Sequence, residues 1–175
     1  MFDMRRLFPL ALAAAFVTSC ATGPSTTGPD VVETHEAMGR WVNQASTAIW
    51  DLRSGARSET EGLDPSLMGD AGWLKLGEAS RSLEIHARRM ADARSVQVGA
   101  RTGQPPGFPS PSEIQSRIDA DPMWFRKLSL QMADNARELN AAARAKDPQR
   151  ANDLIENMNE SCQTCHTRYW ATTAP

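Results

Sequence analysis

The chain of 175 residues lacks the features that define several common protein classes. Its three cysteines are too few for the disulfide framework of a small secreted protein. The formal net charge is −2 and no block of basic residues is present, which argues against nucleic acid as a partner. No stretch is long and apolar enough to cross a membrane, and no alternating pattern indicates a β-strand. What remains is an all-α domain, and 41% hydrophobic residues are enough for its core.

Two of the cysteines belong to one motif near the C-terminus. Cys162, Cys165 and His166 form the pattern C-x-x-C-H, the attachment signature of a c-type haem. Thiols three residues apart lie on one side of a helical turn, where they can form thioethers with the two vinyl groups of one porphyrin. The adjoining imidazole then binds the iron from one face. The motif predicts one covalent haem c per chain.

Two other uses of such cysteines find no support in the sequence. A zinc site would need two further ligands, and no second Cys/His pair supplies them. A thioredoxin-like C-x-x-C would follow a strand in a βαβ pattern, which is not visible here.

The third cysteine follows an apolar segment. Arg5 and Arg6 precede the apolar residues 7–17, which are too short to span a bilayer and are typical of a secretory signal. The sequence Val-Thr-Ser-Cys ending at Cys20 resembles a bacterial lipobox, which implies cleavage before Cys20 and lipidation of it. The alternative is ordinary cleavage nearby, with Cys20 incidental. The predicted organisation is a signal peptide at 1–19, lipidated Cys20 with a flexible tether at 20–29, and a folded haem-binding domain at 30–172.

Apolar residues recur at three- and four-residue steps in four later stretches, which predicts four amphipathic helices. These helices are expected at about 31–53, 71–95, 122–145 and 148–170. The cysteines of the motif lie on the apolar face of the last one. We therefore predict a four-helix bundle with one haem site in its core.

The predicted helix starts carry recognisable caps. Asp30, followed by an acidic residue three positions later, resembles a capping box at the start of the first helix. Asp121 and Asp147 each precede a proline, the arrangement favoured at a helix start. Between the second and third long helices lies a connection of about 25 residues, in which Ser110 and Glu113 indicate one short helix.

An all-helical domain with C-x-x-C-H at the end of its last helix resembles the class II c-type cytochromes, the cytochrome c′ family and its low-spin relatives. The resemblance is carried by residues 162–166 with Tyr169 beyond them, by the Ala-rich third helix ending at 145–147, and by residues 36–39. It implies an up-down-up-down bundle with the haem at one end and a location in the periplasm.

The same topology places Met38 level with His166 to within about one helical turn. Low-spin members of the family have a methionine ligand near the start of the first helix, and Met38 matches that position. The pair Thr34-His35 stands where the family often has Arg-Gln. His35 is therefore an alternative ligand or a partner for a propionate. Met38 as ordinary core packing, with an open iron, is the remaining alternative.

Other side chains are weaker candidates. Trp41 and Tyr169 fit either porphyrin packing or an ordinary core, and Arg168 fits either solvent exposure or a propionate partner. The remaining candidates are expected to be surface or packing residues: His86, Met90, Met123 and, at the opposite end of the bundle, Met68.

The expected function is one-electron transfer by a membrane-anchored periplasmic cytochrome with His166 and Met38 as iron ligands. Its expected partners are membrane-bound or periplasmic redox proteins, and a homodimer is compatible with the sequence. The alternative is a five-coordinate haem that binds nitric oxide or carbon monoxide. A third possibility is an assembly lipoprotein in which C-x-x-C-H is coincidental. In none of the three is the chain expected to be an enzyme.

Overall fold

A computed structural model describes residues 31–57, 62–100 and 107–171 of the chain. The predicted signal peptide, Cys20 and the predicted tether lie outside these residues. In chain order the elements are β1 (Val31–Glu33), α1 (Thr34–Glu36), the π-helical segment η1 (Ala37–Val42), α2 (Asn43–Gly55), α3 (Pro65–Asp92), β2 (Ser95–Gln97), α4 (Pro111–Ala120), α5 (Pro122–Ala145) and α6 (Pro148–Tyr169).

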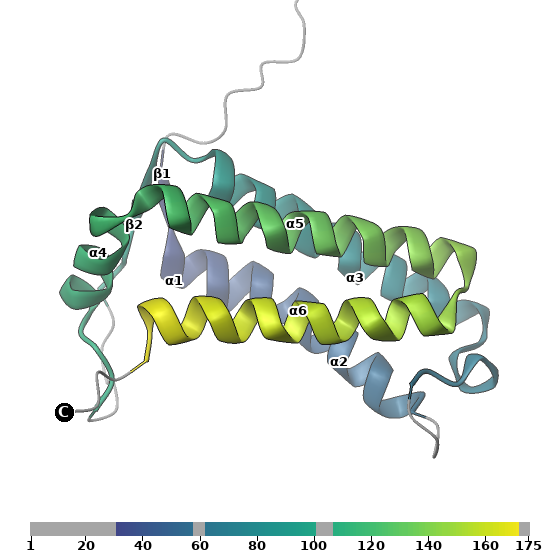
Figure 1. Ribbon diagram of the computed structural model, residues 1–175. Coiled ribbons are helices and arrows are strands. Elements are labelled where there is room, and N and C mark those ends of the chain that lie inside the picture. The colour runs from purple at the N-terminus through teal and green to yellow at the C-terminus, as the bar shows by residue number, and fades with distance from the viewer. Residues whose placement is uncertain (1–30, 58–61, 101–106, 172–175) are drawn as a thin grey trace, which may run out of the picture.

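Four long helical segments form an antiparallel bundle (Figure 1). α1, η1 and α2 follow one another without a break and make up the first segment, and α3, α5 and α6 are the other three. Successive segments run in opposite directions, so the start of α1, the end of α3, the start of α5 and the end of α6 share one end. The short helix α4 lies at this end, which we call the α4 end. The predicted all-α, up-down-up-down four-helix bundle is confirmed.

The first long helix begins later than predicted. β1 precedes it and pairs in parallel with β2. The N-cap is Glu33, not Asp30 as predicted, and its carboxylate accepts the backbone N–H groups of His35 and Glu36 at 2.7 Å each. The expectation that no strand is present was wrong, because a strand of three residues is too short to show an alternating pattern.

The π-helical segment η1 interrupts the first long helix. The N–H of Asn43 donates to the carbonyl of Met38, five residues earlier, whereas α-helical hydrogen bonds join residues four apart. π-helical turns are rare in proteins, and those that occur are often found at functional sites. Met38, the predicted second iron ligand, lies within η1.

α3 begins six residues before the predicted start at residue 71. Asp64 caps it by accepting the Ser66 N–H at 2.8 Å, with Pro65 in the first turn. After that turn Gly69 adopts φ 52° and ψ 179°, a conformation that strains any residue with a Cβ atom. The helix therefore has a kink, and the apolar pattern becomes regular only after it.

The three later helices begin where the sequence predicts. Ser110 and Glu113 form a reciprocal capping box at the start of α4, with N–H to oxygen distances of 2.6 and 3.3 Å. Asp121 caps α5 and Asp147 caps α6, and each is followed by proline. Lys146 ends α5 in the left-handed conformation, with φ 52°. This cap joins α5 to α6 by a short turn at the end of the bundle opposite to α4.

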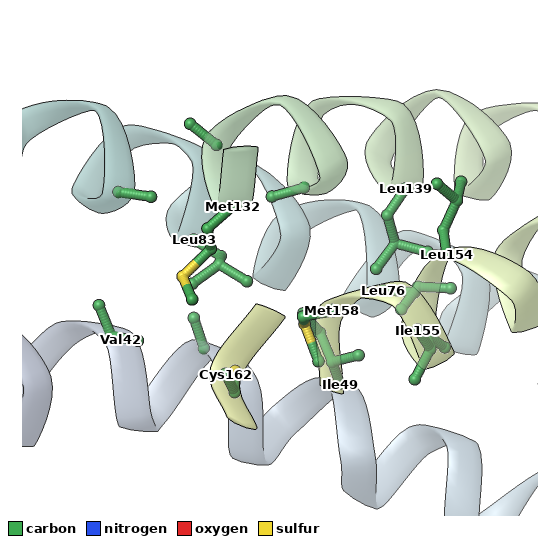
Figure 2. Packing of buried hydrophobic residues seen from close by; sticks show 14 of the residues in the cluster. Val42, Ile49, Leu76, Leu83, Met132, Leu139, Leu154, Ile155, Met158 and Cys162 are labelled. Carbon is green, nitrogen blue, oxygen red and sulfur yellow. The ribbon is translucent and has the colours of Figure 1, made fainter. Parts of the chain in front are cut away.

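The hydrophobic core lies along the axis of the bundle. Its largest fully buried apolar side chains come from all four long segments, and each contributes about 1.5–3 kcal/mol relative to an exposed side chain. They are Ile49, Leu76, Leu83, Leu139, Ile155 and Met158. Figure 2 shows Ile155, Met158 and Cys162 following one another along α6 within this core. Among the described residues, no helix is long and apolar enough to cross a membrane.

Candidate functional site

A cavity opens at the α4 end of the bundle. The space inside it that water-sized molecules can reach is about 120 Å³, and its mouth is open to solvent. Five parts of the chain form its walls. Its lining residues are Thr34, His35 and Met38 of the first helix, Val98 and Gly99 after β2, Pro111, Ile114 and Ile118 of α4, Phe125 of α5, and Cys165, His166, Tyr169 and Trp170 at the end of α6.

The C-x-x-C-H motif lies in the last turns of α6, beside this cavity. Cys165 and His166 line the cavity, whereas Cys162 is buried one turn earlier, where it continues the apolar row of the core (Figure 2). No disulfide joins the two cysteines. Burial raises the pKa of Cys162, and burial together with the neighbouring Cys162 raises the pKa of Cys165 to about 11. Both side chains are therefore protonated and poorly reactive toward oxidants at neutral pH.

His166 lies near the end of α6, where Trp170 contacts both its side chain and its backbone. Trp170 stands edge-on to the imidazole, with the ring centroids 5.3 Å apart and the planes at 87°, and its backbone N–H donates to the His166 carbonyl at 2.7 Å. Burial lowers the pKa of His166. The ring is therefore neutral at physiological pH, and a neutral imidazole is the form that binds a metal.

Met38 and His35 approach the same cavity from the first helix. Met38 is half-buried and packs against the hydrophobic core, while His35 is exposed at the rim. The structure thus brings a thioether and an imidazole from one helix into the cavity that contains His166 of another. Both residue types are known axial ligands of haem iron.

α4 forms one wall of the cavity and is held by two polar side chains. Gln115 accepts the Val98 N–H at 2.8 Å and donates to the Val96 carbonyl at 3.1 Å. Arg117 donates to the carbonyls of Tyr169 and Ala171, at 3.2 and 2.9 Å. These bonds connect α4 to the β2 segment on one side and to the end of the motif helix on the other.

The Glu33 carboxylate holds another wall in place. Besides capping α1, it accepts the Gly99 N–H at 2.7 Å, so the start of the first helix is joined to the segment after β2. A Cβ atom on Gly99 would lie 2.5 Å from this carboxylate, so a side chain there would displace it. Burial raises the pKa of Glu33, but the three backbone donors outweigh it and the net shift is downward.

Comparison with known proteins identifies the family. The protein-family model described as Cytochrome C' matches residues 78–170, which is more than half of the chain and includes the whole motif. The chain belongs to the cytochrome c′ family. It is a class II c-type cytochrome, and its cofactor is one covalent haem c per chain. The match begins within α3, so the first helix with Met38 lies outside it. No curated protein and no solved structure matches the chain.

The residues that a cytochrome c′ cofactor would contact fit the cavity. Its lining is mainly apolar, as a porphyrin face requires, with Cys165 and the neutral imidazole of His166 at one side, and Cys162 lies one turn earlier in α6. The Tyr169 hydroxyl is buried and has no hydrogen-bond partner among the described residues. Because a buried hydroxyl without a partner costs about 1–3 kcal/mol, a polar substituent of the cofactor would stabilise it.

Trp41 and His86 lie away from the cavity lining. They stack on one another, with centroids 5.0 Å apart and planes at 16°, and the Arg89 guanidinium lies over the indole at 4.8 Å from its centroid. His86 was expected to be a surface or packing residue, and it packs on Trp41 with a buried Nδ1 that lacks a partner among the described residues. Burial, together with the charge of Arg89, lowers the pKa of His86.

The remaining candidates are ordinary core or surface residues, which were among the roles expected from the sequence. Met68 and Met90 are buried in the core, and Met123 is 71% exposed, so none of the three lines the cavity. Arg168 is exposed and forms an ion pair with Asp121 at 3.2 Å. Cys20, the predicted lipid attachment site, lies outside the described residues.

Sequence reasoning missed the walls that come from the long connection. Val98, Gly99, Ile114 and Ile118 line the cavity, yet none was a candidate. A signal existed for two of them, because Ile114 and Ile118 are four residues apart in the short helix that the capping box predicts. No local pattern marks Val98 and Gly99, whose position depends on the pairing of β1 with β2.

Proposed function

We propose that this cytochrome c′ family protein transfers single electrons through a haem whose iron is bound by His166 and Met38. The observation that carries the proposal is that both side chains line one cavity, from the last and the first helix. Bound haem supplies the one-electron chemistry, and a methionine ligand raises its reduction potential.

The chain's own residues would hold the cofactor in a defined way. The thiols of Cys162 and Cys165 would form the two thioether bonds, each S–H adding across one vinyl group. His166 would bind one face of the iron as a neutral imidazole, and Trp170 limits the rotation of this ring. The apolar side chains Ile114 and Ile118 of α4 would shield one side of the cofactor from water.

Membrane anchoring through Cys20 is part of the proposal. The family is typically periplasmic, and a lipid on Cys20 would restrict the domain to the membrane surface. Tethering raises the effective concentration near membrane-bound redox proteins, the proposed partners. Labelling of the protein with radioactive palmitate should be lost in Cys20→Ser, with the absorption spectrum unchanged. A Cys20→Ser variant that still incorporates palmitate would contradict lipidation at Cys20.

A second function has an observation in its favour. The cavity wall is largely apolar and open at its mouth, and a five-coordinate haem there would offer a protected site for nitric oxide or carbon monoxide. This function requires that Met38 packs beside the iron without binding it. The two functions differ in one measurable property, the coordination of ferrous iron.

An absorption spectrum of the reduced holoprotein separates the two functions. Electron transfer predicts sharp low-spin bands and no response to carbon monoxide, whereas gas binding predicts an immediate response. Met38→Ala should change a low-spin spectrum to a high-spin one, and Met90→Leu is the control for loss of a buried methionine outside the cavity. Low-spin bands that persist in Met38→Ala but disappear in His35→Ala would assign the ligand to His35 instead.

A further inference from the structure

A second surface feature lies at the start of α5, outside the cavity. It is a shallow hollow in which an exposed methionine and a partly exposed tryptophan are surrounded by charged side chains. We call it the α5 patch; its residues are Asp121, Met123, Trp124, Arg126, Lys127 and Leu130 of the hollow, together with Arg168 of α6. Met123 is the most exposed large hydrophobic residue of the described chain, at 71%.

Two cations lie against the Trp124 ring. The Lys127 ammonium is 4.6 Å and the Arg168 guanidinium 5.5 Å from the ring centroid. Cation–π contacts at exposed sites contribute about 0.5–1 kcal/mol each, so they hold both charges near the indole. An exposed tryptophan and methionine combined with arginine is a composition enriched in protein interfaces and rare on other surfaces.

The charge of the α5 patch is opposite to that of the whole chain. Arg126, Lys127 and Arg168 contribute three positive charges, and Asp121 is the one acidic residue among the patch residues defined above. The chain carries a formal net charge of −2. A local positive field on a negative protein favours encounter with a partner surface that carries carboxylates, in one orientation.

The α5 patch adjoins the wall of the haem cavity. Phe125 follows Trp124 and lines the cavity, where it contacts Tyr169 edge-on with centroids 5.7 Å apart. Arg168 of the patch directly precedes Tyr169, and it follows His166 by two residues. Figure 1 shows the first turn of α5 and the last turn of α6 at the same end of the bundle. A partner seated on the patch would therefore lie at the same end of the bundle as the cavity, next to residues that adjoin its lining.

We propose that the α5 patch is the docking surface for a redox protein that presents carboxylates around its own electron-transfer site. This inference rests on the proposed electron-transfer function and adds the face that is used and the chemistry of the partner. Electrons would enter or leave at the edge of the cavity formed by Phe125 and Tyr169.

Small ions of opposite charge test the position of electron exchange. Stopped-flow oxidation of the ferrous holoprotein by ferricyanide reduces ferricyanide to ferrocyanide as the iron becomes ferric. Lys127→Glu should slow this reaction about five-fold at 0.1 M ionic strength and accelerate oxidation by the cationic tris(phenanthroline)cobalt(III) by a similar factor. Lys127→Glu changes the local charge by two units. The five-fold factor is the Boltzmann factor of the screened Coulomb energy between these two charges and a trivalent ion about 10 Å away in water at this ionic strength.

Arg144→Glu is the matched control, because it makes the same charge change on the same helix. Arg144 lies in the last turn of α5, about 26 Å from Lys127 along the helix axis, so both rates should stay unchanged within a factor of about 1.5. Equal effects of the two substitutions would overturn the proposal. Failure of electron transfer itself would appear differently, as a wild-type holoprotein whose ferrous form binds carbon monoxide at once.

A titration tests the chemistry of the partner. Poly-L-glutamate should shift the indole N–H resonance of Trp124 in the ¹⁵N-labelled Cys20→Ser holoprotein, and Lys127→Glu should weaken this binding several-fold. Vesicles of phosphatidylcholine and phosphatidylserine are the competing probe. Co-sedimentation with these vesicles that depends on Lys127 would assign the patch to anionic lipid and overturn the proposal, whereas the absence of such binding supports a protein partner.

Discussion

At the end of the bundle where α5 passes into α6, the chain turns through one left-handed residue, Lys146, and one capping aspartate, Asp147. At the α4 end the chain forms a strand pair, a π-helical segment and a short extra helix held by side-chain hydrogen bonds. The core between the ends is closely packed by large aliphatic side chains (Figure 2). The opposite end also has an irregular feature, the kink at Gly69, but the irregular elements of the α4 end surround the cavity beside the C-x-x-C-H motif.

This contrast predicts that stability resides in the body of the bundle. Leu139→Ala should lower the free energy of unfolding by about 2–5 kcal/mol, because Leu139 is fully buried between α5 and its neighbours. Denaturant titration of the holoprotein measures the loss, and its haem absorption spectrum should stay unchanged. Leu74→Ala, at a residue that is 65% exposed, is the control and should cost less than about 0.5 kcal/mol. A changed spectrum in Leu139→Ala would show that the two ends are not independent.

Removal of the cofactor should affect the other end. In a Cys162→Ser, Cys165→Ser double variant that contains no haem, amide hydrogen exchange should become about 100-fold faster in α4 and residues 34–42, since the cavity walls lose what they pack against. Exchange in the middle of α5 should change by less than about three-fold. Equal acceleration throughout the chain would mean that the bundle unfolds as a single unit, and the contrast between the ends would fail.

The contacts of α4 offer a smaller and more local test. Arg117→Lys keeps a positive charge but removes the planar fork that reaches the carbonyls of Tyr169 and Ala171. Exchange of the α4 amides should become about 10-fold faster, which corresponds to roughly 1.4 kcal/mol, while the denaturation midpoint changes little. A lower denaturation midpoint with unchanged exchange of the α4 amides would mean that Arg117 stabilises the whole bundle and not α4 in particular.

The smallest effect is expected from Glu33 and depends on pH. Its lowered pKa means that folding favours the carboxylate, so its contribution is complete above the ordinary value of 4.5 and is lost as the pH falls below it. Glu33→Gln should therefore cost about 0.5–1 kcal/mol at pH 7, since solvent screens this partly exposed group, and almost nothing at pH 3. Thermal unfolding at several pH values measures the difference. A cost that is the same at both pH values would contradict the role of the charge.

Much of the fold could be predicted from the sequence because its signals are local. Asp121 and Asp147 with their prolines mark the starts of α5 and α6, and Ser110 with Glu113 marks the start of α4. The start of the first helix was predicted three residues too early, because the acidic residues Asp30 and Glu33 can each serve as a cap. The choice depends on Gly99, 66 residues away, whose N–H is bound by Glu33.

The sequence by itself determined the helical bundle and the C-x-x-C-H motif, since periodicity and helix caps act within a few residues along the chain. The bundle topology expected from the sequence also placed Met38 near His166, but the tertiary structure alone decided that Val98 and Gly99 complete the walls around the motif. Met38 and His35 reach the cavity only because the first helix runs antiparallel to α3 and begins beside the end of α6. Ile114 and Gly99 join them through pairings between segments far apart in sequence. Such pairings depend on the packing of the whole chain, and no local pattern of residues encodes them.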